Sequence, residues 1–193
     1  MRFFNLKARW RGRKAPWLFR ALPDRRGVSA VEFALIAPLL IVLYVGAIEV
    51  GNALTISRRT SAVASTAADL AAQVKTVSNS DLQDIASAAS SILTPSATTP
   101  LKIVLSSVVA DQNNTPKVAW SYATNGAIPR ATNSNYTLPP GLTQANSSVI
   151  VAEVTYAFTP LLNLSGFFNP GSFTMSRTFY ARPRKSLTVA KTN

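Results

Sequence analysis

The feature that most constrains this chain is an apolar run near its amino end. The segment from Phe33 to Ile48 holds sixteen residues without a charge, and Glu32 and Glu49 stand directly outside it. With residues 28–31 added, the run reaches the ~20 residues that an α-helix needs to cross ~30 Å of hydrocarbon. The sequence therefore predicts a membrane-spanning helix, which we bound at residues 28–51.

The positive charge of the chain is concentrated before this run. Residues 1–26 hold nine Lys or Arg and one acid, for a net charge of +8, whereas residues 28–193 carry +4. A nucleic-acid-binding protein would spread basic residues over a folded face with aromatics among them. Since the positive-inside rule explains the same residues, we expect no nucleic-acid partner. We expect a single-pass protein of the inner (cytoplasmic) membrane, with its amino terminus cytoplasmic and its carboxyl-terminal domain outside.

Two interpretations of the basic front are open. It mixes its cations with aromatic residues, so it fits an amphipathic segment lying on an anionic membrane surface. Its position also fits a leader that is discarded after processing, which is the interpretation we favour for residues 1–27. Pro16 and Pro23 would interrupt any long helix here.

The junction between the basic front and the apolar run carries a motif. Gly27 is followed by four residues and then by Glu32 and Phe33, which open the apolar helix. A carboxylate at the rim of a membrane helix is costly unless it is paired or shallow. This arrangement resembles the processing site of type IV prepilins. The wider text GVSAVEFALIAPLLIVLYVGAIEVGNAL, together with VAEVTYAFTPLL and SRTFYARPR near the carboxyl end, is similar to the TadE-like pseudopilins of tight-adherence pilus systems.

The resemblance implies a mechanism and a set of partners. A membrane prepilin peptidase would cut between Gly27 and Val28, and Glu32 and Phe33 would form the assembly and processing motif of the mature helix. The other implied partners are pilin or pseudopilin subunits contacted through the membrane helix, the pilus assembly machinery and the lipid bilayer. The implied product is a minor pilin, in a surface pilus or at its base.

Other export signals fit the sequence less well. Val45-Gly46-Ala47 supplies small residues for a signal-peptidase site, but the basic region before it is unusually long and the apolar run has the length of a span. Arg25-Arg26 resembles a twin-arginine signal, yet Gly27-Val28-Ser29 follows where a more apolar stretch is expected.

Catalytic chemistry has few candidate residues. The chain contains no cysteine and no histidine, which removes thiolate metal sites and the usual general base. Eight carboxylates show no paired arrangement, and no phosphate-binding loop is present in the sequence. We therefore expect no enzyme activity, no cofactor and no metal.

Residues 52–99 predict a helical stem, a second helix and a linker. The stem carries one narrow apolar stripe, which favours packing on the protein's own domain. This stripe consists of Val63, Ala67, Leu70, Val74 and Val77. A break at residues 78–80 follows, with Ser80 and Gln83 as a predicted capping box, and the second helix ends before Pro95.

Residues 100–193 predict a β-rich extracytoplasmic domain. Alternating residues indicate a hairpin around the turn at 111–116, with Ile103, Leu105 and Val109 sharing one face and Val118, Trp120 and Tyr122 alternating in the returning strand. An exposed loop is expected at 127–148. The next predicted strand has alternate residues on one face, namely Ile150, Ala152, Val154, Tyr156 and Phe158. It is followed by an apolar loop at 161–171 and a last strand at 172–181. The predicted fold class is α+β, with a pilin-like antiparallel sheet of about four strands against the stem.

Two further interpretations compete with the pseudopilin. One is a single-pass membrane-anchored domain that binds a ligand or surface and has no role in a pilus. The other is a secreted or periplasmic binding domain whose first fifty residues are removed.

Overall fold

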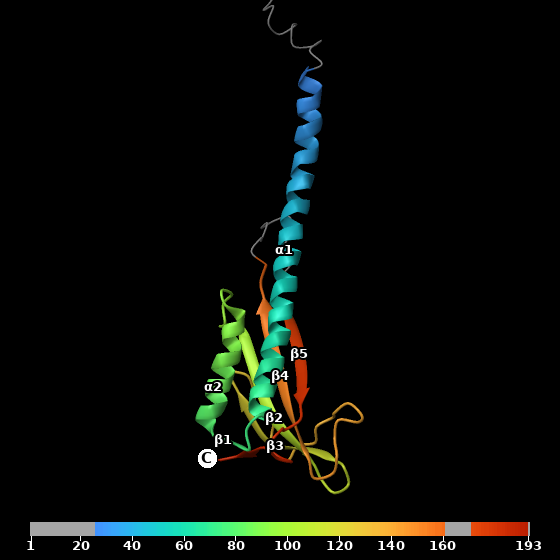
Figure 1. The fold of residues 1–193 in the computed structure, drawn as a ribbon. Coiled ribbons are helices and arrows are strands. Elements are labelled where there is room, and N and C mark those ends of the chain that lie inside the picture. The colour runs from blue at the N-terminus through green and yellow to red at the C-terminus, as the bar shows by residue number, and fades with distance from the viewer. Residues whose placement is uncertain (1–25, 161–170, 193) are drawn as a thin grey trace, which may run out of the picture. The chain divides into compact units, whose positions relative to one another are not determined.

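The computed structural model describes residues 26–160 and 171–192. Residues 1–25 of the predicted leader, which we bound at residues 1–27, and residues 161–170 of the predicted apolar loop lie outside the described residues. The chain divides into two units, Met1–Gly46 and Ala47–Asn193, and each is described by itself. Helix α1 (Arg26–Ala72) contributes to both of them (Figure 1).

The described part of the first unit is the apolar half of α1. The five successive residues from Leu39 to Leu43 are each more than half exposed, although all are large and apolar. Because successive residues of a helix point in different directions, these side chains cover every side of it. A helix that is apolar on all sides requires apolar surroundings on all sides.

The second unit contains the polar half of α1, which packs on a β-sheet. The buried face is wider than the predicted stripe and consists mostly of small side chains. Its buried residues are Ile56, Thr60, Val63, Ala64, Ala67, Ala68, Ala71 and Ala72. Of the predicted stripe, Val63 and Ala67 are buried, Leu70 is partly buried and Val74 is exposed, because the helix ends at Ala72. The preference for the protein's own domain as the partner is confirmed.

The second helix, α2 (Asn79–Ser90), continues into the short 3-10 helix η1 (Ser91–Leu93). Its capping box is made by Ser78 and Asp81, so the predicted pair Ser80 and Gln83 is wrong. The Ser78 amide donates to the Asp81 carboxylate at 2.8 Å, and the Asp81 amide donates to Ser78 Oγ at 3.2 Å. The Ser78 hydroxyl donates to the same carboxylate at 2.8 Å, and the hydrogen bonds from the Ser78 amide and hydroxyl lower the pKa of Asp81. Asp serves as well as Glu at this position because its shorter side chain still reaches the amide of the capping residue.

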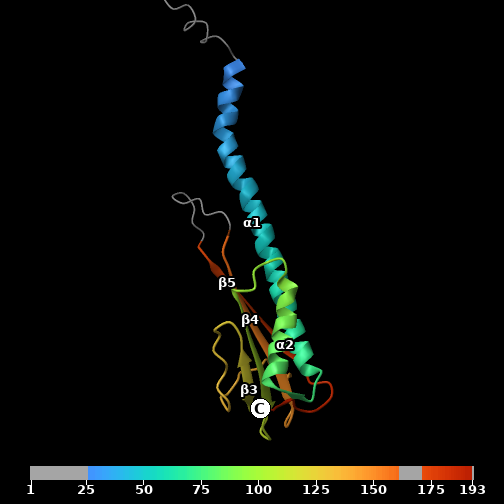
Figure 2. The ribbon, with the colours of Figure 1, turned by 90° about the vertical axis from the view of Figure 1, so that its left-hand side faces the viewer.

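Four strands form an antiparallel sheet in the order β3-β2-β4-β5. The predicted α+β architecture, with a long apolar first helix, a short second helix and a four-stranded antiparallel sheet, is confirmed. Figure 2 shows α2 and the neighbouring part of α1 along one side of the sheet. The strands are β2 (Leu101–Ala110), β3 (Pro116–Ala123), β4 (Ser148–Phe158) and β5 (Phe173–Ala181).

The sheet has an apolar cluster on each face. The larger one joins α1, α2 and the inward side chains of β2 and β4, including Ile103 and Ile150. A β-bulge between Ser107 and Val108 shifts the register of β3, so Val118 faces the other side of the sheet from Trp120. The predicted simple alternation of Val118 and Trp120 is therefore wrong, since a bulge inserts one residue and reverses the faces beyond it.

The smaller cluster explains a second departure from prediction. The loop between β3 and β4 was expected to be exposed, but Tyr136 and Leu138 pack from it onto the outer face of the sheet. They cover Val108, Val118, Val149 and Val151. Many other residues of this loop are exposed, as expected.

Residues 182–192, which follow β5, form a carboxyl-terminal strap that the sequence did not predict. Strand β1 (Thr76–Val77) pairs in parallel with β6 (Ala190–Lys191). The Thr192 amide donates to the Val77 carbonyl at 2.8 Å, and buried Trp120 Nε1 donates to the Val189 carbonyl at 2.8 Å. Strands of two residues carry no periodic signal, so pattern analysis does not detect them.

A second contact of the strap lies at the end of α1. The Arg184 amide donates to the Ala72 carbonyl at 2.9 Å, and the Arg184 guanidinium pairs with Asp69. One orphan carbonyl of the last helical turn is thereby satisfied.

We expect Arg59→Ala to lower the free energy of unfolding by about 1–2 kcal/mol, because a charged donor to the backbone is lost. Arg59 reaches from α1 to the end of η1, where its guanidinium donates at 2.9 Å to each of the Leu93 and Thr94 carbonyls. Its neighbour Arg58 is exposed and serves as the matched control. Urea unfolding of the detergent-solubilised chain measures both variants, and an equal loss in Arg58→Ala would contradict the contact's role.

Candidate functional site

The predicted cleavage site lies in the first turn of α1. Gly27 and Val28 are both exposed, and a Cβ built on Gly27 meets nothing within 4 Å. The amide groups of a first helical turn have no partner within the helix, so this turn opens more easily than the interior. Gly27 further weakens it, because glycine is about 1 kcal/mol less favourable in a helix than alanine.

The predicted assembly motif follows one turn later. Glu32 lies four residues after Val28, so both point from the same face of the helix. Glu32 is exposed, and Phe33 beside it is 66 % exposed. The structure thus places the four predicted residues, Gly27, Val28, Glu32 and Phe33, in two successive turns that no described side chain covers.

The surroundings of this motif are set by the apolar half of α1. Among the described residues, α1 is the one helix long and apolar enough to cross a membrane. This supports a single-pass membrane protein, with the motif at the amino end of the span.

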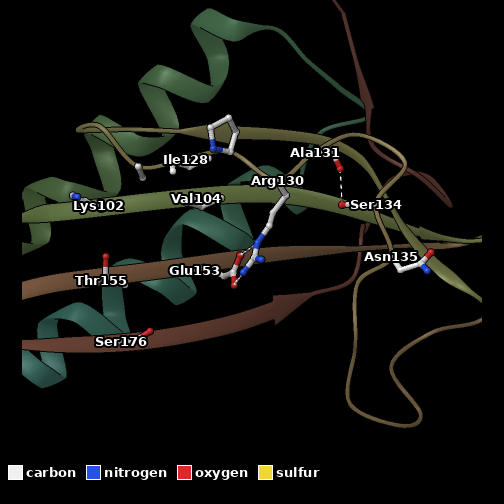
Figure 3. Close-up of a pocket in the computed structure, with 12 residues that line it drawn as sticks. Lys102, Val104, Ile128, Arg130, Ala131, Ser134, Asn135, Glu153, Thr155 and Ser176 are labelled. Carbon is white, nitrogen blue, oxygen red and sulfur yellow. Dashed lines mark hydrogen bonds and ion pairs between the residues drawn. The ribbon is translucent and has the colours of Figure 1, made fainter.

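A separate concave site lies on the outer face of the sheet. It is an open cleft of about 660 Å³ between the strands and the start of the loop after β3 (Figure 3). Its lining includes Lys102 and Val104 from β2, Glu153 from β4, Ser176 from β5 and Arg130 from the loop. Sequence analysis did not identify this site, because a loop rich in Pro and Asn gives no sign of where it folds back.

One ion pair holds the loop over the cleft. Arg130 Nε and Nη2 donate to the two carboxylate oxygens of Glu153 at 3.0 and 2.6 Å, a bidentate geometry. The Arg130 amide also donates to Ser121 Oγ on β3 at 3.0 Å. The side-chain hydrogen bonds and the charge of Glu153 raise the pKa of Arg130.

Tyr136 packs beside this pair. The Arg130 guanidinium lies 5.6 Å from the centre of the Tyr136 ring, within reach of a cation–π contact. Burial, followed by the charge of Glu153, raises the pKa of the Tyr136 hydroxyl. Tyr136 therefore remains neutral at physiological pH.

The chemistry available in the described part of the chain is limited. The one acid of the cleft, Glu153, is engaged by Arg130, and so is poorly placed to act as a general base. No group of three or more His, Cys, Asp or Glu side chains that could hold a metal lies together among the described residues. The cleft therefore fits a structural or binding role better than a catalytic one.

We expect Glu153→Gln to accelerate hydrogen exchange at the Asn133 and Tyr136 amides by about 2–5-fold, since half-exposed ion pairs contribute under about 1 kcal/mol. These amides bond the loop to β3, at the Val118 and Pro116 carbonyls. The control is Lys117→Ala, which removes the looser pair with Asp111 at 3.7 Å. If both variants change exchange equally, the Arg130–Glu153 pair is not what fastens the loop.

Comparison with known proteins bears on the first of these sites. Comparisons with curated proteins and with solved structures found no match. A family model, described as TadE-like protein, matches residues 27–69. The match begins at Gly27 and covers the apolar helix and most of the stem, which is 43 of the 193 residues. The match agrees with the resemblance found in the sequence: residues 27–69 of this chain are similar to TadE-like proteins.

Proposed function

We propose that this protein is a pseudopilin, or minor pilin, which a membrane prepilin peptidase processes and which takes part in assembling a tight-adherence type pilus. The observation that best supports the proposal is that the family match starts at the predicted cleavage site. The TadE-like match begins at Gly27, the residue after which the sequence motif predicts the cut. The basic leader before it, the glutamate five residues after it and the apolar helix all fit the same interpretation.

Gly27 suits the peptidase for two reasons. A residue without a side chain lets an enzyme approach the backbone closely. The first turn of α1 must also unwind before its peptide bond enters a protease site, and glycine makes this unwinding cheaper. Cleavage between Gly27 and Val28 would leave a helix that begins with the free or methylated amine of Val28.

That amine would need a negative partner. The amino end of a helix already carries about half a positive charge, so a cationic amine there is unfavourable without a counter-charge. Glu32 lies about 6 Å further along the helix, at 1.5 Å per residue. In two neighbouring helices offset by about one turn, Glu32 of one lies beside Val28 of the other.

The low dielectric of the membrane would make this pairing selective. A lone carboxylate or amine in hydrocarbon costs about 3 kcal/mol or more, whereas a pair of them neutralises both. A subunit without a neighbour is thus penalised and an assembled one is not. This would favour assembly through the membrane helix.

The topology follows from the charge distribution. We propose that residues 1–27 remain cytoplasmic until cleavage, residues 28–51 span the inner membrane, and the stem at 52–99 leads to the domain at 100–193 outside. The mature protein would act in the pilus or at its base, with the assembly machinery and other subunits as partners.

A membrane-anchored binding domain without a pilus role is the second candidate. The observation that favours it is the cleft of about 660 Å³ on the outer face of the sheet. This candidate requires neither cleavage after Gly27 nor a partner for Glu32.

Amino-terminal sequencing of the membrane-extracted protein separates the candidates. We expect the mature chain to start at Val28 and Gly27→Leu to abolish this cut, because a bulky side chain blocks the approach to the backbone. Gly27→Ala adds only a methyl group at the same position, and this control should slow cleavage less than Gly27→Leu. A start at Met1 would support the anchored domain instead, and a start near Ile48 would support a secreted one.

Substitution of Glu32 tests the assembly step alone. We expect Glu32→Gln to leave cleavage nearly unchanged but to reduce the pilus yield at least tenfold, because an isosteric amide cannot neutralise the amine. Glu32→Asp keeps the charge and should retain most of the yield. Mass spectrometry of sheared surface filaments measures the outcome, and a normal yield in Glu32→Gln would remove the charge pairing from the mechanism.

A further inference from the structure

The two edge strands of the sheet, β3 and β5, differ in whether their outward backbone groups are hydrogen-bonded. The outer edge of β3 is covered, because the Val118 amide donates to the Ser134 carbonyl at 3.0 Å and the Tyr136 amide donates to the Pro116 carbonyl at 3.0 Å. At the other edge, β5 pairs with β4 along its nine residues. Within residues 26–160 and 171–192, no backbone group bonds to its far side, and Figure 1 shows β5 as the last strand there.

An open edge of this length is a template for another strand. About every second residue of an edge strand directs its amide and carbonyl outward. Proteins protect such edges from unwanted pairing with short strands, prolines, bulges or charged side chains. Strand β5 contains no proline, and its pairing with β4 is regular from Phe173 to Ala181.

The protection that β5 does carry is one arginine at its centre. Arg177 lies midway between Phe173 and Ala181. Its guanidinium donates to Ser57 Oγ at 2.6 Å and Ser61 Oγ at 3.1 Å on α1. It also donates to the carbonyl of Ser176 at 2.9 Å, so it covers part of the strand's own backbone.

This position of Arg177 works against pairing with a second copy. Two identical strands that pair antiparallel about a two-fold axis at their midpoint place their central residues opposite each other. Two copies of β5 would set Arg177 against Arg177, and like charges directly opposite are destabilising. A strand with acidic residues meets no such penalty.

The rest of the edge is basic as well. Arg182, Arg184 and Lys185 follow directly after β5 and are exposed. Asp69, the acid beside them, is bound by Arg184 and by Gln73. Arg182 also donates to the Gly141 and Leu142 carbonyls at 3.0 and 3.1 Å. Residues 173–185 hold four basic residues and no acid, a net charge of +4, which favours an acidic segment as a partner.

The edge also leaves apolar surface for a partner to cover. Phe173 and Phe179 point to the helix side of the sheet, in register with Phe158 and Ala152. They remain 46 % and 43 % exposed, because β5 has no further strand beside it. An added strand would cover part of both rings.

From these observations we propose that β5 is a docking edge, which binds an extended acidic segment of another protein as a fifth strand of the sheet. Main-chain hydrogen bonds would supply the affinity, and the arginines would select the acidic sequence. This proposal concerns the folded domain and holds whether or not Gly27 is a cleavage site.

The test uses the detergent-solubilised full chain and two synthetic nine-residue peptides. One alternates Thr with Glu, and the other alternates Thr with Lys. We expect the Thr/Glu peptide at millimolar concentration to slow hydrogen exchange of the outward amides of β5 by about tenfold or more, because a new strand takes them up. The Thr/Lys peptide should give no protection.

Charge reversal supplies the matched variants. Arg177→Glu combined with Arg182→Glu should reverse the preference toward the Thr/Lys peptide. Lys117→Glu changes the charge in the same direction on β3, the opposite edge strand of the sheet, and should leave the preference unchanged. Exchange at the amides of β2 and β4 checks that each variant is folded.

Three results would overturn the proposal. The first is that neither peptide protects β5 of the unsubstituted chain, and the second is that both peptides protect it equally. The third is that protection in the absence of peptide rises with protein concentration. The last result would assign the edge to a second copy of the chain. Since the comparison of the two peptides uses the unsubstituted chain, the proposal is tested even if a variant fails to fold.

Discussion

The domain depends on the apolar cluster through which α1 packs on the sheet. From Ala64 to Ala72 the buried positions of the helix are alanines, and all of them are at most 1 % exposed. These alanines belong to the cluster that joins α1 to α2 and the sheet, and van der Waals contacts are dense in such a core. Replacing one of them with a larger side chain would separate the two layers, and overpacking of this kind destabilises as surely as a cavity does.

Much of the fold was predictable because its elements are long and periodic. The apolar helix, the hairpin of β2 and β3, and strands β4 and β5 all carry clear patterns in the sequence. The departures have local physical causes. The bulge after Ser107 reversed the faces of β3, and Ser78 with Asp81 replaced the expected cap of α2. Long-range contacts, such as Trp120 with Val189, leave no mark in a local window.

The two candidate sites differ in what the sequence reveals of them. The motif from Gly27 to Phe33 is contiguous, so its spacing alone identifies it, and the structure adds that its two turns are uncovered by described side chains. The cleft is made by residues from three strands and a loop. Arg130 and Glu153 are separated by 23 positions, and only the folded sheet brings them together. A single arginine in a loop, such as Arg130, belongs to no periodic sequence pattern, so its ion-pair partner cannot be predicted from the sequence.

The carboxyl-terminal strap has a consequence for the order in which the domain is made. Thr192 bonds to Val77 across 115 positions, and Arg184 completes the last turn of α1. Contacts this distant in sequence form slowly, because a long loop must close first. The ribosome synthesises the strap well after α1, so the contacts between the strap and the end of α1 form late. Until then, the end of the stem is held by α2 and the sheet alone.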